Sequence, residues 1–171
     1  NNVVVCKKNY LDLYMDKKKI AILFLGDFFY DARTINMAIS LEPYFSVTII
    51  SPFEKNLNNT LFEKIHFYKI NITKKGILKY WEYHKKVSVK LAQNNYDIII
   101  AGDLYSLSSA ALNKDNQKIV YDCREIYTAL TAHNGKPLHR FACSIYEKYF
   151  LKFVNDIIVT ANTDLTFLKK K

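Results

Sequence analysis

The sequence predicts an α/β fold: a doubly wound, Rossmann-like parallel sheet of about six strands, in a single domain. Short, almost continuous apolar runs alternate along the chain with segments of helical spacing, as is typical of a parallel sheet with helices on both faces. The chain has 171 residues, half of them hydrophobic, which suits one domain with a sizeable core. We therefore expect the strand order 3-2-1-4-5-6, and neither an antiparallel meander nor two separate cores.

The first half of the chain supplies three of these strands. Residues 19–25 form an apolar run between lysines and a Gly-Asp pair, which predicts a strand buried on both faces. A helix is expected over 31–41, with its first aspartate placed as the N-cap. Two further strands are expected over the β-branched segment 46–51, which stops at Pro52, and over 64–70.

Residues 76–94 give the strongest helical pattern. The residues expected on its buried face are Ile77, Trp81, His84, Val87 or Ser88, and Leu91. The residues expected on the opposite, solvated face are Lys75, Lys79, Glu82, Lys86 and Lys90. This placement makes His84 a core-side residue of the helix.

The second half of the chain repeats the alternation. Strands are expected over 96–101, 118–122 and 156–160, with a short helix over 104–112. Residues 125–132 can form one or two helical turns, and 138–154 a long helix. The buried face of that long helix would hold Leu138, Ala142, Ile145, Tyr149 and Phe153.

The composition indicates the cellular compartment in which the protein is expected. No apolar run approaches the roughly 18 residues that a membrane-spanning helix needs, and no signal peptide is recognisable at the start. Three widely spaced cysteines, Cys6, Cys123 and Cys143, offer neither a disulfide framework nor a CxxC metal pair. We therefore expect a reducing, cytoplasmic environment.

The ends of the sequence suggest one part of a longer protein. Met15 stands directly before the first strand, as a natural start would. We accordingly divide the chain into an N-terminal extension, residues 1–17, and a domain over 18–171.

Positive charge is concentrated in one segment. The formal charge is +9. The segment from Lys69 to Lys90 contains seven lysines and one acid, Glu82, so its net charge is +6. Such a cluster can attract nucleic acid, anionic lipid or phosphorylated ligands. It is equally compatible with an ordinary solvated helix face, and composition does not choose between the two.

Ligands of open parallel sheets bind beyond the carboxyl ends of the strands. This rule selects three loops, each with a carboxylate, and the candidate residues in them are Gly26, Asp27, Asp103, Asp122, Arg124 and Glu125. Carboxylates there can hold sugar hydroxyls, and Arg33 and Arg124 could hold a phosphate or pair with the acids. Helix capping is the competing interpretation, especially for Asp31 and for Asp103. A binding role is favoured where two acids and Arg124 crowd the end of one strand.

Several common sites are excluded. The sequence has no GxGxxG after its first strand, no P-loop and no GxSxG nucleophile elbow. Its four histidines lack metal-ligand spacing, so we expect no metal ion and no cofactor. No basic–aromatic RNA-binding motif is present, and we do not expect a nucleic-acid partner.

The ordered series of motifs resembles the N-terminal domain of GT-B-type glycosyltransferases of the group 1, family 4-like class. The resemblance covers roughly residues 18–171. It is carried by the helix start Asp31-Ala-Arg33 before a strand over 47–51, and by segments similar to the family patterns "yDiih..d..sl" (96–107), "vvyD.hE.y" (119–127) and "aD.iitvs" (154–162).

The resemblance implies that this domain binds the acceptor, while a C-terminal domain, absent here, binds most of the nucleotide-sugar donor without a metal ion. Gly26 and Asp27 would lie near the diphosphate, and Asp103, Asp122 and Glu125 would bind acceptor hydroxyls. Arg124 stands where relatives usually place His. Arginine cannot act as a general base, although it can stabilise a leaving diphosphate.

We therefore expect the acceptor-binding half of a glycosyltransferase that acts on a glycan or lipid-linked acceptor in cell-surface polysaccharide synthesis. It would be inactive alone, and cytoplasmic or peripheral at an anionic membrane surface. The alternative is a non-catalytic Rossmann-like domain that uses its basic helix face to bind an anionic partner.

Overall fold

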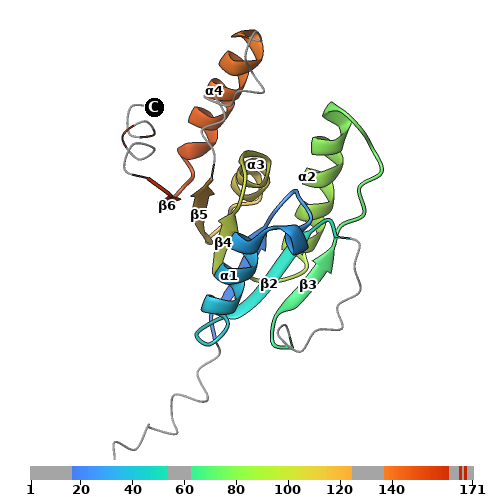
Figure 1. Ribbon diagram of the computed structural model, residues 1–171, viewed down its shortest axis with the longest axis vertical. Coiled ribbons are helices and arrows are strands. Elements are labelled where there is room, and N and C mark those ends of the chain that lie inside the picture. Colours follow the sequence, from blue (N-terminus) through green and yellow to red (C-terminus); the bar gives the residue numbers. More distant parts are fainter. Residues whose placement is uncertain (1–16, 54–62, 125–136, 162–165, 167, 169–171) are drawn as a thin grey trace, which may run out of the picture.

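Six parallel strands form one sheet in the order β3-β2-β1-β4-β5-β6 (Figure 1). The computed structural model describes residues 17–53, 63–124, 137–161, 166 and 168. The predicted fold class and strand order are confirmed. The strands are β1 (Lys19–Leu23), β2 (Ser46–Ser51), β3 (His66–Lys69), β4 (Ile98–Ala101), β5 (Lys118–Cys123) and β6 (Asp156–Val159).

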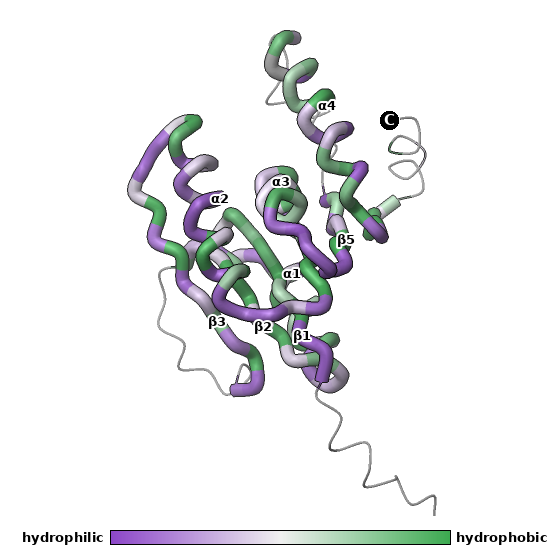
Figure 2. Tube along the Cα trace, turned by 180° about the vertical axis from the view of Figure 1, so that it is seen from behind, coloured by the Kyte–Doolittle hydropathy of each residue, from purple (hydrophilic) through white to green (hydrophobic). Residues whose placement is uncertain are grey.

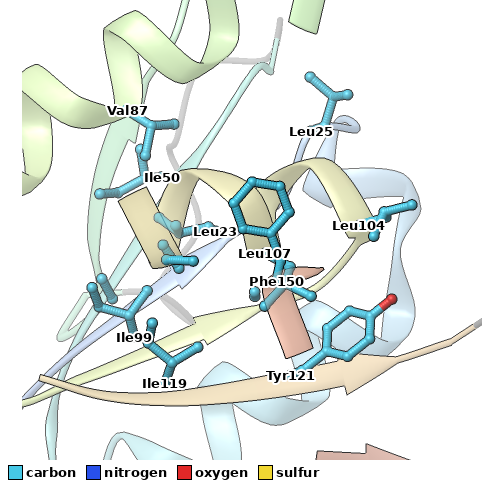
Figure 3. Packing of buried hydrophobic residues seen from close by; sticks show 14 of the residues in the cluster. Leu23, Leu25, Ile50, Val87, Ile99, Leu104, Leu107, Ile119, Tyr121 and Phe150 are labelled. Carbon is cyan, nitrogen blue, oxygen red and sulfur yellow. The ribbon is translucent and has the colours of Figure 1, made fainter. Parts of the chain in front are cut away.

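Helices cover both faces of the sheet, and each face has its own core. Along β1, Ile20 and Ile22 belong to one apolar cluster, whereas Ala21 and Leu23 belong to the other, because successive side chains of a strand point to opposite faces. The first cluster is covered by the 3₁₀ turn η2 (Phe28–Tyr30) and α1 (Ala32–Leu41). The second is covered by α2 (Ile77–Ala92), α3 (Leu104–Leu112) and α4 (Pro137–Leu151) (Figures 1, 2 and 3).

Helix α2 buries only part of the predicted face: Val87 and Leu91 are buried as expected, but Ile77 and Trp81 are not. Ile77 and Trp81 are 81% and 63% exposed, whereas Tyr83, Val87 and Leu91 are buried. The Tyr83 hydroxyl shares a 2.8 Å hydrogen bond with Ser106 Oγ of α3, which satisfies its polar group inside the core. His84 is only half-buried, and its ring lies 3.3 Å from Ser109 Oγ.

Helix α4 is also turned relative to the prediction. Its buried residues include Cys143, Glu147 and Phe150, whereas Leu138, Ile145 and Tyr149 are exposed. The reason is the same in both helices: each carries more apolar residues than one face can bury, so spacing alone does not tell which of them contact the sheet. Phe153, just beyond the helix, is partly buried against the core as expected.

Some predictions fall outside the described residues. These are the N-terminal extension up to residue 16, the helical turns over 125–132, and Glu125. Over the described part of the chain, no helix combines the length and apolarity needed to cross a membrane.

Glu82 fixes the segment that leads into α2. Its carboxylate accepts hydrogen bonds from the backbone N–H groups of Thr73 (3.0 Å) and Lys74 (2.8 Å), and it pairs with Lys86 at 2.8 Å. The helix begins after Gly76, which has a φ of 57° and provides no side-chain cap. Glu82 therefore holds this segment from within the helix, and the hydrogen bond from Lys86 together with the backbone donors lowers the pKa of Glu82 to about 2.

This lowered pKa predicts an acid-sensitive contribution to stability. Because the folded-state pKa of about 2 lies below the reference value of 4.5, Glu82 stabilises the fold above pH 4.5, and its contribution is lost as the pH falls towards 2. Urea unfolding at a series of pH values should show a stability difference between the parent and Glu82→Gln that shrinks over this window. Asp115→Asn, an exposed acid elsewhere, is the control. A difference that does not change with pH would contradict this role.

Candidate functional site

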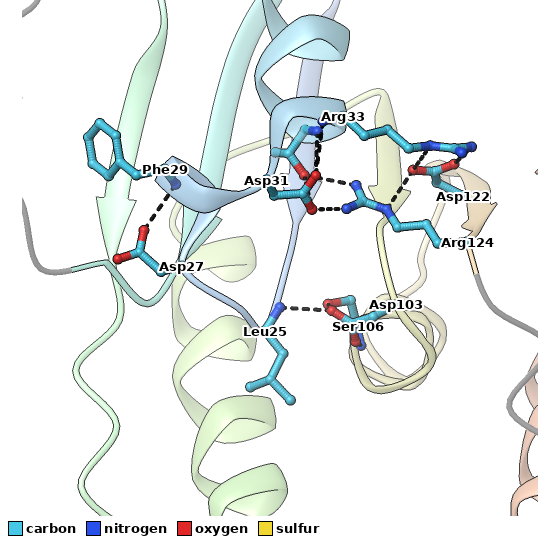
Figure 4. A network of polar contacts seen from close by, with 10 residues as sticks. Leu25, Asp27, Phe29, Asp31, Arg33, Asp103, Ser106, Asp122 and Arg124 are labelled. Atoms are coloured by element: carbon cyan, nitrogen blue, oxygen red, sulfur yellow. Dashed lines mark hydrogen bonds and ion pairs between the residues drawn. The ribbon is translucent and has the colours of Figure 1, made fainter. Parts of the chain in front are cut away.

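The carboxyl ends of β1, β4 and β5 lie side by side, because these strands are neighbours in the sheet. Their loops bring five of the six predicted site residues to one edge: Gly26, Asp27, Asp103, Asp122 and Arg124. Figure 4 shows the last four of these. The sixth, Glu125, lies outside the described residues.

Asp103 caps α3 and also holds the β1 loop. Its Oδ1 accepts the Ser106 N–H, and its Oδ2 accepts the Ser106 hydroxyl and the Leu25 N–H, each at 2.8 Å (Figure 4). Burial raises the pKa of Asp103, although these hydrogen bonds oppose the rise. With both oxygens occupied, Asp103 acts in this structure as the capping residue that one interpretation of the sequence predicted.

Asp122 lies between two arginines. Its fully buried carboxylate accepts hydrogen bonds from Arg33 Nε (3.1 Å) and Arg124 Nε (2.9 Å), and it is also paired with Arg33 Nη2. Burial raises the pKa of Asp122, and the hydrogen bond and charge of Arg33 oppose that rise. We call these three residues and Asp31 the Asp122 network.

All three guanidinium nitrogens of Arg124 are bound to protein groups, and its Nε donates to Asp122. Its Nη1 pairs with Asp31 and its Nη2 donates to Thr34 Oγ1 at 2.8 Å. Its guanidinium lies 4.8 Å from the centre of the Phe24 ring. A Cβ at Gly102 would come within 3.1 Å of Arg124 Nη2 and 3.2 Å of the Leu23 carbonyl, which explains the glycine. Arg124 therefore joins β5 to the start of α1.

Arg33 is the more open cation. Its side chain is 31% exposed, compared with 17% for Arg124, and its Nη1 donates no hydrogen bond to the described residues. Asp122 holds its other two nitrogens in place, so this remaining nitrogen is presented at the carboxyl edge. The sequence analysis named both arginines as possible phosphate ligands and preferred Arg124, whereas in the structure Arg33 is the more exposed of the two.

Gly26 and Asp27 follow β1 beside a hollow. A Cβ at Gly26 would lie 2.7 Å from the Phe24 ring, so a larger residue would displace that ring. Asp27 Oδ1 accepts the Phe29 N–H at 3.0 Å and caps η2, whereas Oδ2 accepts no hydrogen bond from the described residues.

The hollow, which we call the β1–β3 pocket, has a volume of about 550 Å³ and lies beyond the carboxyl ends of the first three strands. It combines a carboxylate, aromatic rings, an amide and a lysine. Its lining residues are Asp27, Tyr30, Pro52, Phe53, Lys69, Ile70, Asn71 and Ile72. The sequence analysis named only Asp27 among them as a site residue. Their positions were an available signal, because Tyr30 lies in the loop region after β1, Pro52 and Phe53 follow β2, and residues 69–72 end or follow β3.

Asp103→Ala should lower the free energy of unfolding by about 2–4 kcal/mol, because it removes a helix cap and leaves the Leu25 N–H without its acceptor. Asp27→Ala, which removes the cap of a single turn, should cost about 1 kcal/mol or less. Urea denaturation measures both. An Asp103→Ala variant as stable as the parent would show that the carboxylate does not hold this edge.

Comparison with known proteins supports the fold. No protein-family model and no curated protein matches the sequence. Among solved structures, the chain is similar to a protein of Listeria monocytogenes assigned as a UDP-N-acetylglucosamine 2-epimerase, with a TM-score of 0.60 and 14% identity over 91% of this chain. The match covers 43% of that protein, so the chain spans less than half of its length.

Two plant structures are more distant. One is UGT2 of Phytolacca americana in complex with UDP-2-fluoro-glucose and pterostilbene, with a TM-score of 0.48 and 13% identity over 73% of this chain and 35% of that one. The other is a UGT transferase of Siraitia grosvenorii in complex with UDP, with a TM-score of 0.45 and 11% identity over 70% of this chain and 33% of that one. Because both of these TM-scores are below 0.5, the comparison of folds depends on the Listeria protein. The six-stranded sheet and this match together show that the chain has the fold of a GT-B-type domain.

Proposed function

We propose that this chain is the acceptor-binding half of a glycosyltransferase. The observation that carries the proposal is the β1–β3 pocket, which opens at the carboxyl edge of a GT-B-type sheet beside Gly26 and Asp27. The nucleotide-sugar donor would bind mainly to a second domain, and the sugar would pass to a glycan or lipid-linked acceptor held in the pocket.

The chemistry of the pocket suits a sugar. Tyr30 and Phe53 offer apolar ring surfaces, while Asp27 and Asn71 offer hydrogen-bonding groups that can meet hydroxyls. The open Oδ2 of Asp27 is available as an acceptor. A volume of about 550 Å³ is that of an ordinary small-molecule site.

Arg33 would bind the diphosphate that leaves the sugar donor. The open Nη1 of Arg33 can donate to a phosphate oxygen and stabilise the charge that develops as the bond between the sugar and the diphosphate breaks. Asp122 would orient Arg33, and Arg124 would keep Asp122 in place. The sequence analysis assigned acceptor hydroxyls to Asp103 and Asp122 and placed Asp27 near the diphosphate. Because the oxygens of Asp103 and Asp122 already accept hydrogen bonds from the protein, we assign the acceptor hydroxyls to Asp27 instead.

The wider setting is also part of the proposal. We place the protein in the cytoplasm, at the inner face of the cell membrane, in the synthesis of a cell-surface polysaccharide. The lysine-rich segment around α2 would then face anionic lipid. The alternative, a non-catalytic domain with an anionic partner, draws on the same lysines and predicts no role for the β1–β3 pocket.

A binding experiment separates the two functions. NMR spectra of the protein would be followed during titration with UDP, as a diphosphate probe, and with methyl glycosides of common hexoses, as acceptor probes. The glycosides should shift the amide signals of Tyr30, Phe53 and Asn71, and Asp27→Asn should weaken that response. Arg33→Gln should weaken UDP binding about tenfold or more, as expected for loss of a charge-assisted hydrogen bond.

Arg140→Gln is the matched control, because Arg140 is an exposed arginine on α4. UDP should bind this variant as it binds the parent. Shifts confined to the α2 lysines, with Arg33→Gln binding UDP like the parent and no response to any glycoside, would favour the alternative.

A further inference from the structure

A second pocket, which we call the lysine pocket, adjoins the β1–β3 pocket at the end of β3. It has a volume of about 510 Å³ and is formed by the end of β3, the segment that leads into α2, and α2 itself (Figure 1). Three residues line both pockets: Lys69, Ile70 and Asn71. Lys69 and Asn71 are exposed, and Lys69 Nζ lies 5.6 Å from the centre of the Phe53 ring, which lines the β1–β3 pocket. The two pockets therefore meet along an exposed border.

Helix α2 forms the long wall of the lysine pocket. Its lining side chains make two neighbouring rows at a spacing of four residues, one of Trp81, Lys85 and Val89 and the other of Glu82, Lys86 and Lys90. These rows extend over about 14 Å of the helix axis. Trp81 is 63% exposed, and Lys85 Nζ lies 5.5 Å from the centre of its ring. The wall thus offers an aromatic ring and ammonium groups along its length.

Most of the positive charge in the lysine pocket is uncompensated. Lys86 pairs with Glu82 at 2.8 Å and also donates to the Asn71 carbonyl oxygen. The Glu82 carboxylate is further occupied by the backbone N–H groups of Thr73 and Lys74. Among the described residues, no carboxylate pairs with the other four lysines of the lining, which are Lys69, Lys74, Lys85 and Lys90.

The contacts that these lysines do make leave their charge in place. Lys90 Nζ lies 4.9 Å from the centre of the Tyr68 ring, and Lys69 and Lys85 lie over aromatic rings in the same way. Ammonium groups gathered in one concavity repel one another, and an anionic ligand relieves that repulsion. The lysine pocket is therefore built to receive negative charge.

We propose that the acceptor is an anionic glycan, a sugar chain with carboxylate or phosphate groups, which extends from the β1–β3 pocket into the lysine pocket. This inference rests on the proposed function and names the class of its acceptor. The terminal sugar would lie in the β1–β3 pocket, where the open Oδ2 of Asp27 accepts a hydrogen bond from a hydroxyl. The chain would then cross the shared border at Lys69 and Asn71.

Beyond this border the lysine pocket would hold the next units of the chain. The exposed ring of Trp81 offers an apolar surface on which a sugar ring can lie. The ammonium groups of Lys74, Lys85 and Lys90 would bind the anionic groups through charge-assisted hydrogen bonds. A neutral glycan would leave these charges unmatched, so the pocket selects for an acidic one.

The shape of the lysine pocket favours a chain over a membrane surface. A narrow polymer can enter a concavity and continue into the neighbouring pocket, whereas a bilayer presents a broad, flat surface that does not follow either. Lys75 and Lys79 do not line the lysine pocket, and the inference leaves them to the lipid contact of the proposed function.

A matched pair of oligosaccharides tests the inference. The probes are a galacturonate trimer and the same trimer with its carboxylates methyl-esterified, which differ in charge and not in their sugars. Trp81 is the one tryptophan of the chain, so its fluorescence reports binding at the lysine pocket. We expect the anionic trimer to bind at least tenfold more tightly than the ester at low salt, and its binding to weaken as salt is raised.

A glycerol phosphate oligomer of equal charge is the second anionic probe. Tight binding of the trimer alone would identify carboxylates as the preferred groups, tight binding of the phosphate oligomer alone would identify phosphates, and binding of both would show that either suffices. In NMR spectra, the anionic probe that binds should shift the amide signals of Tyr30 and Phe53 as well as those of Lys74 and Lys85, because the chain spans both pockets.

Two double variants separate local charge from net charge. Lys74→Gln with Lys85→Gln should weaken binding of the anionic probe about tenfold or more, because two charge-assisted contacts are lost. Lys118→Gln with Lys148→Gln removes the same net charge from exposed lysines of β5 and α4 that line neither pocket, and should bind like the parent. All four substitutions replace exposed side chains, and a circular dichroism spectrum checks the fold of both variants.

The inference would be overturned by equal affinity for the anionic trimer and its ester together with no binding of the phosphate oligomer. An equal loss of affinity in both double variants would also overturn it, as would shifts at the lysine pocket without any at Tyr30 and Phe53. Binding of phosphatidylglycerol vesicles that depends on Lys74 and Lys85, with no binding of either anionic probe, would assign these lysines to a membrane instead. The UDP and methyl glycoside titrations use uncharged sugars and other variants, so the proposed function can stand where this inference fails.

Discussion

The carboxyl edge of this sheet is organised by one buried carboxylate held between two arginines. A carboxylate without exposure is costly unless its charge is compensated, and Asp122 is compensated by both Arg33 and Arg124. Arg33 comes from α1 and lies 89 residues before Asp122 in the sequence, so this pairing joins the start of α1 to the end of β5. Gly102 is part of the same constraint, because a side chain there would meet the Arg124 guanidinium.

This constraint divides the polar residues of the edge into two groups. Asp31, Asp103 and Arg124 have their charged atoms bound within the protein, where they cap helices and hold loops. Arg33 and Asp27 each keep one polar atom without a partner among the described residues. Asp122 holds Arg33 in position, and Asp103 holds the loop after β1 that carries Asp27. Arg33 and Asp27 are the two residues that we propose bind ligands.

Much of the fold could be predicted from the sequence, because short apolar runs bounded by turn residues are typical of strands in a parallel sheet. The N-cap of α1 at Asp31 and the bounds of α3 were likewise predictable from local signals. The faces of α2 and α4 were not, since spacing shows where apolar residues gather but not which of them the sheet covers. Ile77, Trp81 and Leu138 were therefore expected in the core and are exposed.

The candidate site was predicted only in part for a similar reason. The rule for strand ends located the correct loops, yet it could not show that Asp122 is paired with Arg33 rather than open to a ligand. That pairing depends on how close the start of α1 comes to the carboxyl end of β5, which no local pattern contains. The aromatic residues of the β1–β3 pocket were missed because Tyr30 and Phe53 come together only when η2 meets the end of β2.

A double-mutant cycle between Arg33 and Asp122 tests the central claim most directly. The free energy of unfolding would be measured for the parent, Arg33→Gln, Asp122→Asn and the double variant. If Asp122 holds Arg33 in place, the two substitutions should be non-additive, with a coupling free energy of about 1–3 kcal/mol. A coupling within about 0.5 kcal/mol of zero would contradict the claim, because the two side chains would then contribute independently.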